Sequence, residues 1–513
     1  MNRCSQKNNL LKRIIPLQAK VAIPIFSFIF LLAIPNLVQA KSNLFLFLPA
    51  IIGNGHNSAP PPGIGVLAPP GLGTPPKGNG QYTLIAWNDL GMHCMDPSFE
   101  DFSILPPYNT LWAQVIRRGD GPAIVTSNIT VEYRILGNTR SDNKTNFWQY
   151  AQKLFGVSLA PNIGLKGNGL SGRMKVDTDH FVAEAIPLTE YLDSNTTTPY
   201  PYQVAELVAK DSSGHILAST QTVAPVSTEL HCETCHGDNG SANHGIATGV
   251  VKQNILTLHD QNHSTNLMAQ RPVLCANCHS SNALGTAGKP GIPNLSNAIH
   301  GKHASAGIDD GTMEGTCYAC HPGAQTKCLR GAMFLAGKTC YDCHGNLTAV
   351  ANSNRRPWID EPRCDQCHDA AHGENSGTLY RFSKGHQGIY CQACHGSQHA
   401  ITPSREKNDN IQAILLQGHA GTIDTCTVCH VTQPSFGGPH NDIMHPIGQT
   451  WVSGHQHANK STCAQCHGTT SAGTPYSAVK VAETINAGEY GIKHWAAGYQ
   501  VSCWSCHNSP NPD

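Results

Sequence analysis

Charged residues are scarce in this chain of 513 residues: Asp, Glu, Lys and Arg together make up 13% of it. The 34 basic and 34 acidic residues leave a formal net charge of zero when histidine is neutral. An excess of one sign is what draws a protein to nucleic acid, to a charged membrane surface or to an acidic partner. The composition lacks that excess, so we expect no nucleic-acid partner.

Regular secondary structure is also scarce in the second half of the chain. Residues 228–513 show little helical or strand periodicity, whereas Gly, Pro, Asn and Ser are common, as in Gly285–Gly291 and Gly437–Pro439. These residue types mark turns and loops. The segment is therefore predicted to consist of short helical turns joined by loops.

A repeated pattern, Cys-x-x-Cys-His, does occur, and it occurs nine times. Two thiols three positions apart can form thioether bonds to one haem, and the histidine that follows can bind the iron from one side. We number these motifs 1 to 9 in chain order. The predicted attachment residues are Cys232, Cys235, Cys275, Cys278, Cys317, Cys320, Cys340, Cys343, Cys364, Cys367, Cys391, Cys394, Cys426, Cys429, Cys463, Cys466, Cys503 and Cys506. The predicted proximal iron ligands are His236, His279, His321, His344, His368, His395, His430, His467 and His507.

Zinc ribbons and redox disulfides also use Cys-x-x-Cys. Zinc needs two such pairs for each ion and no histidine after every pair, and nine is an odd number. A redox disulfide usually occurs once, beside a strand-helix pattern that this chain lacks. We therefore expect nine covalent haem c groups, one in about every thirty residues, and a domain whose core is formed by its cofactors, so that the unloaded chain does not fold.

The second axial position of each iron decides the chemistry, because a filled position favours electron transfer and an open one permits substrate binding. Histidines outside the motifs are numerous, and several stand beside Gly or Pro, where the backbone can turn toward a flat ring. His300 and His303 are spaced to share one face of a turn. The candidate distal ligands are His259, His300, His303, His386, His399, His419, His440, His445 and His455. Which ligand serves which motif is left open.

The amino terminus predicts export. Basic residues precede an apolar run over Val21–Ile34, and Val38–Ala40 suits signal peptidase. We expect residues 1–40 to be a cleaved signal peptide and the protein to reach the periplasm, the outer surface or the extracellular space. Residues 41–80 combine an apolar segment with a linker rich in Pro and Gly. An uncleaved anchor that uses Leu44–Ile52 is the alternative.

Residues 81–227 are predicted to form a separate all-β domain, sandwich-like in architecture, before the haem domain at 228–513. They contain several runs of β-forming residues and no haem motif. The last two runs are separated by a turn sequence and read as a hairpin. The predicted strands are Gln81–Trp87, Leu111–Ile116, Ile129–Leu136, Gln203–Ala209 and Ile216–Val223.

The stretch Trp87–Asp96, which reads Trp-Asn-Asp-Leu-Gly-Met-His-Cys-Met-Asp, stands out in the β domain. Copper would suit its soft side chains, but consecutive residues of a strand point to opposite faces. A disulfide between Cys94 and Cys328 is the preferred interpretation, because these two are the cysteines of the mature chain that the motifs leave unused. A haem capped by His93, or an atypical attachment that uses Cys328 with Cys343, are the alternatives.

On these motifs, residues 81–513 resemble a family of secreted multihaem c-type cytochromes in which a β domain with this stretch precedes a haem-rich half. Similar cytochromes carry electrons across the periplasm and the outer surface to minerals, partner cells or electrodes. The resemblance implies redox partner proteins or an extracellular electron acceptor. Self-association into a filament or complex is a further alternative that it raises.

Together these features predict an exported carrier that passes electrons along nine haems, rather than a catalytic oxidoreductase, and we assign no catalytic residue. One alternative is a multihaem reductase of a small nitrogen or sulfur oxyanion with one open-site haem. Another is a surface protein whose β domain binds a partner while the haems stiffen it. A complete set of distal histidines favours the carrier.

Overall fold

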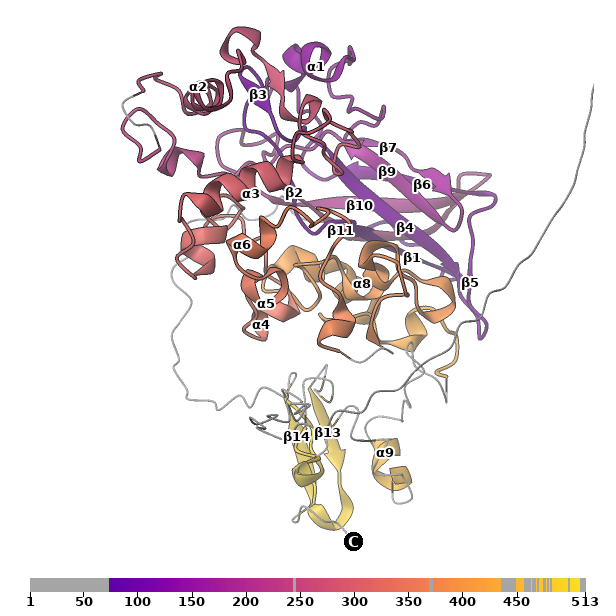
Figure 1. Ribbon diagram of the computed structural model, residues 1–513. Helices are drawn as coiled ribbons and strands as arrows, with labels where there is room; N and C mark the ends of the chain where they lie inside the picture. Colours follow the sequence, from indigo (N-terminus) through magenta and orange to yellow (C-terminus); the bar gives the residue numbers. More distant parts are fainter. Residues whose placement is uncertain are drawn as a thin grey trace, which may run out of the picture. The chain divides into compact units, whose positions relative to one another are not determined.

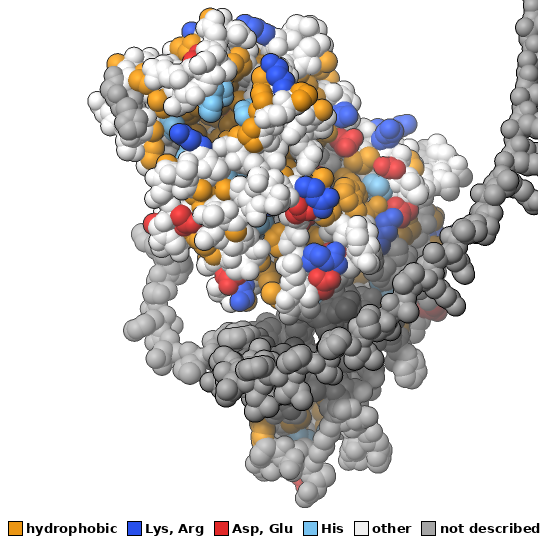
Figure 2. Space-filling model, viewed as in Figure 1, with side chains coloured by type: hydrophobic (Ala, Val, Ile, Leu, Met, Phe, Trp, Pro, Cys, Tyr) orange, Lys and Arg blue, Asp and Glu red, His pale blue; other side chains and the backbone are white. Residues whose placement is uncertain are grey.

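The computed structural model describes residues 73–513, apart from 243–245, 369–371, 435–448, 456–462, 464–466, 468–469, 474–476, 478, 480–481, 497–498 and 508–513 (Figure 1). The predicted signal peptide, most of the linker, His440, His445 and Cys466 lie outside the described residues. No described helix has the length and apolar character that crossing a bilayer requires. On the face drawn in Figure 2, basic and acidic side chains are interspersed.

Two five-stranded sheets form the amino-terminal domain. The first has the order β1 (Tyr82–Asn88), β4 (Asn109–Arg117), β9 (His180–Ile186) and β8 (Lys175–Asp177), with β5 (Ala123–Ile124) paired to β4. The second has the order β2 (His93–Cys94), β11 (Ile216–Ser227), β10 (Tyr202–Asp211), β6 (Ile129–Ile135) and β7 (Ser171–Arg173). The pairs are antiparallel except that β2 runs parallel to the end of β11.

The core of this domain lies between the two sheets and consists of the apolar side chains that both sheets point inward. Leu84, Leu111 and Phe181 of the first sheet and Leu207 of the second are fully buried in one cluster. Helix α1 (Phe147–Phe155) contributes Phe147 to the same cluster. All five predicted strands are found, and β10 and β11 pair as the predicted hairpin. The all-β, sandwich-like class is thus confirmed.

The segment after Ser227 contains short helices and few strands, as predicted. Its longest helices are α2 (Val251–His263) and α3 (Leu295–Ser305). Strand β3 (Phe102–Ser103), which precedes this segment, pairs with β12 (Val273–Leu274) inside it. The segment also contains α4 (Ala332–Leu335), α5 (Cys340–His344), α6 (Leu347–Val350), α7 (Cys391–His395), α8 (Ile411–Gln417), α9 (Gln449–Gly454), and the paired strands β13 (Glu483–Asn486) and β14 (Ile492–Trp495). Figure 1 shows α8 beside β1 and β11.

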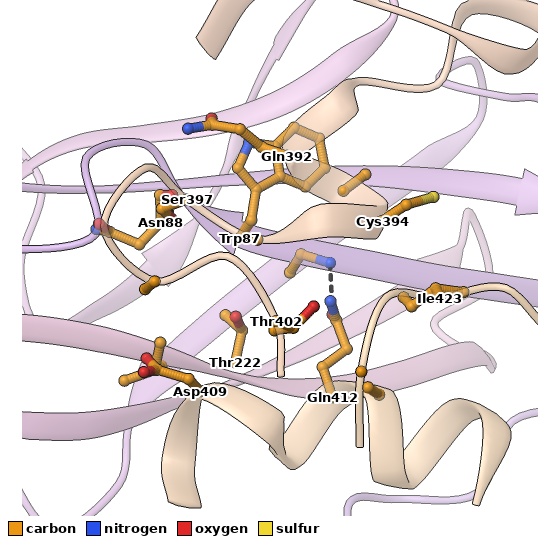
Figure 3. Close-up of a pocket in the computed structure, with 17 residues that line it drawn as sticks. Trp87, Asn88, Thr222, Gln392, Cys394, Ser397, Thr402, Asp409, Gln412 and Ile423 are labelled. Carbon is orange, nitrogen blue, oxygen red and sulfur yellow. Dashed lines mark hydrogen bonds between the residues drawn. The ribbon is translucent and has the colours of Figure 1, made fainter. Parts of the chain in front are cut away.

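The surface between the sheets and motif 6 is tightly packed (Figure 3). The side-chain oxygen of Gln412, on α8, accepts hydrogen bonds from the Ala86 backbone N–H (2.7 Å) and the Thr220 hydroxyl (3.2 Å). Gln392, in motif 6, donates to the Asp89 carbonyl (2.8 Å). The cavity left there is about 40 Å³, which holds no more than a few water molecules.

The Trp87–Asp96 stretch is part of this surface. Gly91 adopts a left-handed backbone with φ of 80°. A Cβ atom at this position would lie 2.4 Å from the Gln398 carbonyl oxygen, so only glycine permits the approach. The Ser397 hydroxyl donates to the Asn88 carbonyl on the same loop. The stretch therefore docks the loop that follows motif 6 onto the β domain.

Replacing Gln412 with Ala should lower the stability of the haem-loaded protein by about 1 to 3 kcal/mol, because the buried Ala86 N–H would lose its acceptor. Chemical denaturation followed by circular dichroism measures this loss. Gln152→Ala on the exposed face of α1 is the matched control, for which a change within about 0.5 kcal/mol is expected. Equal unfolding midpoints for the two variants would contradict this account of the interface.

Candidate functional site

Each described motif forms a single helical turn. In motif 1 the His236 N–H donates to the Cys232 carbonyl at 2.8 Å, and the Cys235 N–H donates to the same oxygen at 3.2 Å. The same pattern recurs in motifs 2, 3, 5, 7 and 9, and motifs 4 and 6 form helices α5 and α7. Residues i, i+3 and i+4 of one turn share a face. The two thiols and the imidazole are thus presented together, as covalent attachment of one haem requires.

Six motif histidines face a second histidine from elsewhere in the chain. All six second histidines are among the predicted distal ligands. The distances between ring centroids are 6.1 Å for His236 and His303, 6.3 Å for His279 and His259, 6.1 Å for His321 and His300, 6.2 Å for His344 and His399, 6.0 Å for His430 and His386, and 5.7 Å for His507 and His455.

This spacing fits iron held between two imidazoles. A metal binds an imidazole nitrogen at about 2 Å, so two rings on opposite sides of one metal have centroids about 6 Å apart. Rings in direct stacking contact would lie closer, like Trp112 and His180 at 4.4 Å. The donor set therefore fits haem iron with both axial positions filled.

Helix α3 carries two of these facing histidines on one face. The His300 Nδ1 lies 2.8 Å from the Ser296 carbonyl oxygen, and the His303 Nδ1 lies 2.7 Å from the Ile299 carbonyl oxygen. Donation from Nδ1 to the preceding turn fixes the tautomer and leaves Nε2 for the metal. The Asn294 side chain caps the helix by accepting from the Asn297 N–H at 2.9 Å, which satisfies a terminal donor.

Backbone carbonyls orient further ligands in the same way. His279 Nδ1 lies 2.8 Å from the Pro293 oxygen, and His467 Nδ1 lies 2.8 Å from the Val501 oxygen. His455 Nδ1 lies 3.1 Å from the Val452 oxygen. These oxygens are functional groups that sequence reasoning missed, because a carbonyl leaves no signature in the residue types.

Two other histidines use the nitrogen that a metal would need. His93 Nε2 contacts Asp89 Oδ1 at 2.8 Å, which disfavours the idea that His93 caps a haem. Both ring nitrogens of His231 lie against carboxylates, those of Glu229 and Glu233. Among the described residues, no group of three His, Cys, Asp or Glu side chains could hold a bare ion, so the copper alternative gains no support.

The imidazoles of His321 and His344 are held in the neutral form, which is the form that binds a metal. Burial, followed by the neighbouring histidines, lowers the pKa of His321 to about 4. Burial, followed by His399, Arg355 and His300, lowers the pKa of His344 to about 4. His300 and His399 lie near both rings, so the sites of motifs 3 and 4 are neighbours.

Motif cysteines also lie next to one another along a continuous series. Cys317 and Cys340 shift each other's pKa, lowering that of Cys317 and raising that of Cys340, which places motif 3 beside motif 4. Elsewhere burial is the largest cause of a raised cysteine pKa, and the charge of a cysteine of another motif adds to it, which requires the two sulfurs to be near each other. This influence places motif 1 near motif 3 (Cys232 and Cys320) and motif 4 near motif 5 (Cys343 and Cys367). It likewise places motif 5 near motif 6 (Cys364 and Cys391) and motif 6 near motif 7 (Cys394 and Cys429).

Motif 2 adjoins motif 1 at the other end of this series. Lys252 and Asp96 influence both Cys232 and Cys275, so both motifs lie around this pair. The Lys252 ammonium lies 3.6 Å from Asp96 and 4.6 Å from the centre of the Phe102 ring. These influences indicate the neighbouring pairs 2 and 1, 1 and 3, 3 and 4, 4 and 5, 5 and 6, and 6 and 7, a series that differs from the order of the motifs in the sequence.

The other predicted site residues are placed as follows. His419 Nε2 lies 3.4 Å from the Thr425 hydroxyl, directly before motif 7. Cys94 and Cys328 are not joined in this structure, and they pack in one apolar cluster with Met92, Tyr202 and Val223. The disulfide between them remains a prediction.

Comparison with known proteins places the second half of the chain. Residues 333–512 match the family described as outer membrane cytochrome MtrC/MtrF-like, domains II/IV. This segment is therefore similar to multihaem cytochrome domains of that family. The match contains motifs 4 to 9 and supports the recognition of the chain among the multihaem cytochromes of extracellular electron transfer. No curated protein and no solved structure matches the chain.

The pairing of ligands on α3 is testable by combining variants. His303→Ala should open one iron site, that of motif 1, and His300→Ala should open that of motif 3. Electron paramagnetic resonance of the oxidised protein should then show one high-spin iron in each variant, because an imidazole ligand has been lost. Mass spectrometry of the same samples checks that all haems remain attached.

Removal of one attachment site identifies which iron has opened. In a Cys232→Ala, Cys235→Ala background, His303→Ala should add no high-spin signal, whereas His300→Ala should add one. The reverse result would mean that the two histidines serve the opposite motifs.

Proposed function

We propose that the protein conducts electrons along nine covalently bound haems, from a donor protein in the periplasm or outer membrane to an acceptor outside the cell. The observation that carries this proposal is the continuous series of neighbouring sites from motif 2 to motif 7. Adjacent sites are what stepwise electron transfer requires. A catalytic enzyme would need only one site reachable by substrate.

The filled axial positions support transfer over catalysis. Six sites present two imidazoles each, and an iron with two histidine ligands has no open position for substrate. When bound, haem supplies an iron that gains and loses single electrons. The chain's own residues attach the cofactors, orient the axial rings and keep neighbouring sites at fixed separations.

Residues between the sites hold this arrangement in place. The Tyr341 hydroxyl of motif 4 donates to Asp309 at 2.8 Å, on the segment that leads into motif 3. The buried Tyr380 lies between motifs 5 and 6 and donates to the Gly396 carbonyl at 2.8 Å. The Ile423 N–H, just before motif 7, donates to the Cys394 carbonyl of motif 6 at 3.0 Å. These contacts fix the distance over which each electron moves.

Export fits this role. Haem attachment to c-type motifs takes place outside the cytoplasmic membrane, and the predicted signal peptide at residues 1–40 would deliver the chain there. The balanced charge favours partners that are recognised by shape and by local contacts rather than by a strong electrostatic field.

Electron paramagnetic resonance with mass spectrometric haem counting tests the proposal on the native protein. Nine haems that are all low-spin are expected, because every iron would have two histidine ligands. One high-spin iron in nine would contradict a pure carrier and favour the reductase of a small oxyanion.

Removing one attachment site at a time tests the order of the series. Loss of the motif 4 haem, in a Cys340→Ala, Cys343→Ala variant, should slow electron transfer through the protein at least tenfold, because it breaks the middle of the series. The matched Cys275→Ala, Cys278→Ala variant removes the haem of motif 2 at its end and should leave transfer among the others intact. Stopped-flow reduction resolves the two cases, and equal effects would contradict the order.

A further inference from the structure

The Nδ1 atom of His399 has a different kind of neighbour from the Nδ1 atoms of His300, His303 and His455. The Nδ1 atoms of His300, His303 and His455 lie against backbone carbonyl oxygens at 2.8, 2.7 and 3.1 Å. His399 Nδ1 instead faces the sulfur of Cys328 at 3.8 Å, within the distance of a hydrogen bond to sulfur. Because Nδ1 is taken up in this contact, Nε2 is the nitrogen left to face His344.

Backbone hydrogen bonds between the segment that follows Cys328 and His399 bring Cys328 to this position. The His399 carbonyl accepts from the N–H groups of Arg330 (2.8 Å) and Gly331 (2.9 Å), so the two segments are joined beside the imidazole. A Cβ atom on Gly331 would lie 2.4 Å from the Ile401 nitrogen, so this approach requires glycine. His399 itself is held at a φ of 61°, which non-glycine residues rarely adopt.

A buried ion pair between Arg330 and Asp409 stabilises this segment. The Arg330 side chain is fully buried, and its Nε and Nη2 atoms donate to Asp409 at 2.7 and 2.9 Å. Its third nitrogen donates to the Cys328 carbonyl at 3.1 Å. Planar, bidentate pairing of this kind fixes geometry as well as charge. These contacts hold the backbone of Cys328 beside His399.

We propose that Cys328 positions His399 and sets the reduction potential of the motif 4 site by accepting the hydrogen bond from His399 Nδ1. This inference rests on the proposed function, since it takes His399 as an axial ligand. A ligating histidine usually donates its second N–H to a carbonyl or a carboxylate, which makes the imidazole a stronger electron donor. Sulfur is a weak acceptor, so His399 donates less to its iron than His300 or His303 does to theirs.

The consequence is that the motif 4 site has a higher reduction potential than the neighbouring motif 3 site. A weaker electron donor stabilises the oxidised iron less, so the motif 4 site is easier to reduce than its neighbour at motif 3. Cys328, which no haem motif uses, thereby acquires a role that does not depend on a disulfide.

Redox titration of the haem-loaded protein followed by its optical spectrum tests the proposal. Cys328→Ser replaces sulfur with a stronger acceptor, so one of the nine components should move to a more negative potential while the others stay. Cys328→Ala removes the acceptor and should move the same component to a more positive potential or alter its low-spin resonance signal. Cys94→Ser, which changes a thiol of the same cluster, is the matched control and should leave the titration unchanged.

Three results would overturn the proposal: an unchanged titration in both Cys328 variants, a shift of all components together, and the same shift in Cys94→Ser. Haem counting by mass spectrometry confirms that each variant is fully loaded. His399→Ala separates this inference from the proposed function. If that variant shows no high-spin iron, His399 is not an axial ligand and the site assignment itself fails, whatever the Cys328 variants do.

Discussion

The spacing between facing imidazole rings, which fits two axial ligands of one iron, is the constraint on which the sites of this structure depend. Six facing pairs have centroids 5.7 to 6.3 Å apart, and each pair joins a motif to a residue outside it. After residue 227 the helices are short and loops are common. Each pair closes a loop in the way that a structural metal does in a small domain. The facing pairs therefore add constraints to those of the hydrogen bonds and ion pairs of this segment, such as Arg330 with Asp409.

The β domain provides what the haem segment lacks, which is a conventional apolar core. Its buried side chains, such as Leu111 and Phe181, form a rigid support against which motif 6 and α8 pack through Gln392 and Gln412. The Trp87–Asp96 stretch is part of this support. Its residues hold the loop after motif 6, which continues to His399, so the distinctive sequence serves docking rather than metal binding.

Much of this arrangement could be predicted from the sequence because its signals are local. A strand has a two-residue period and a motif turn needs only five consecutive residues, so β1, β10 and the nine motifs are evident without a structure. The three-residue interval between His300 and His303 likewise placed both on one helical face. Strand β9 was missed because His180–Ile186 does not alternate and is almost wholly buried.

The partners of these local elements could not be predicted, because they depend on contacts across long stretches of chain. Nothing in the residues near His386 indicates that it faces His430, and nothing near Cys328 indicates His399. His231 is not among the predicted distal ligands. The carboxylates of Glu229 and Glu233 lie against both its ring nitrogens, and only the fold reveals this.

Helix α3 couples two sites that lie apart in the sequence. His303 faces the histidine of a motif about seventy residues earlier, while His300 faces that of a motif that comes later. Because one helix carries both rings, a displacement of α3 would move both facing pairs together. The two sites therefore respond to the same local distortion and are not independent of each other.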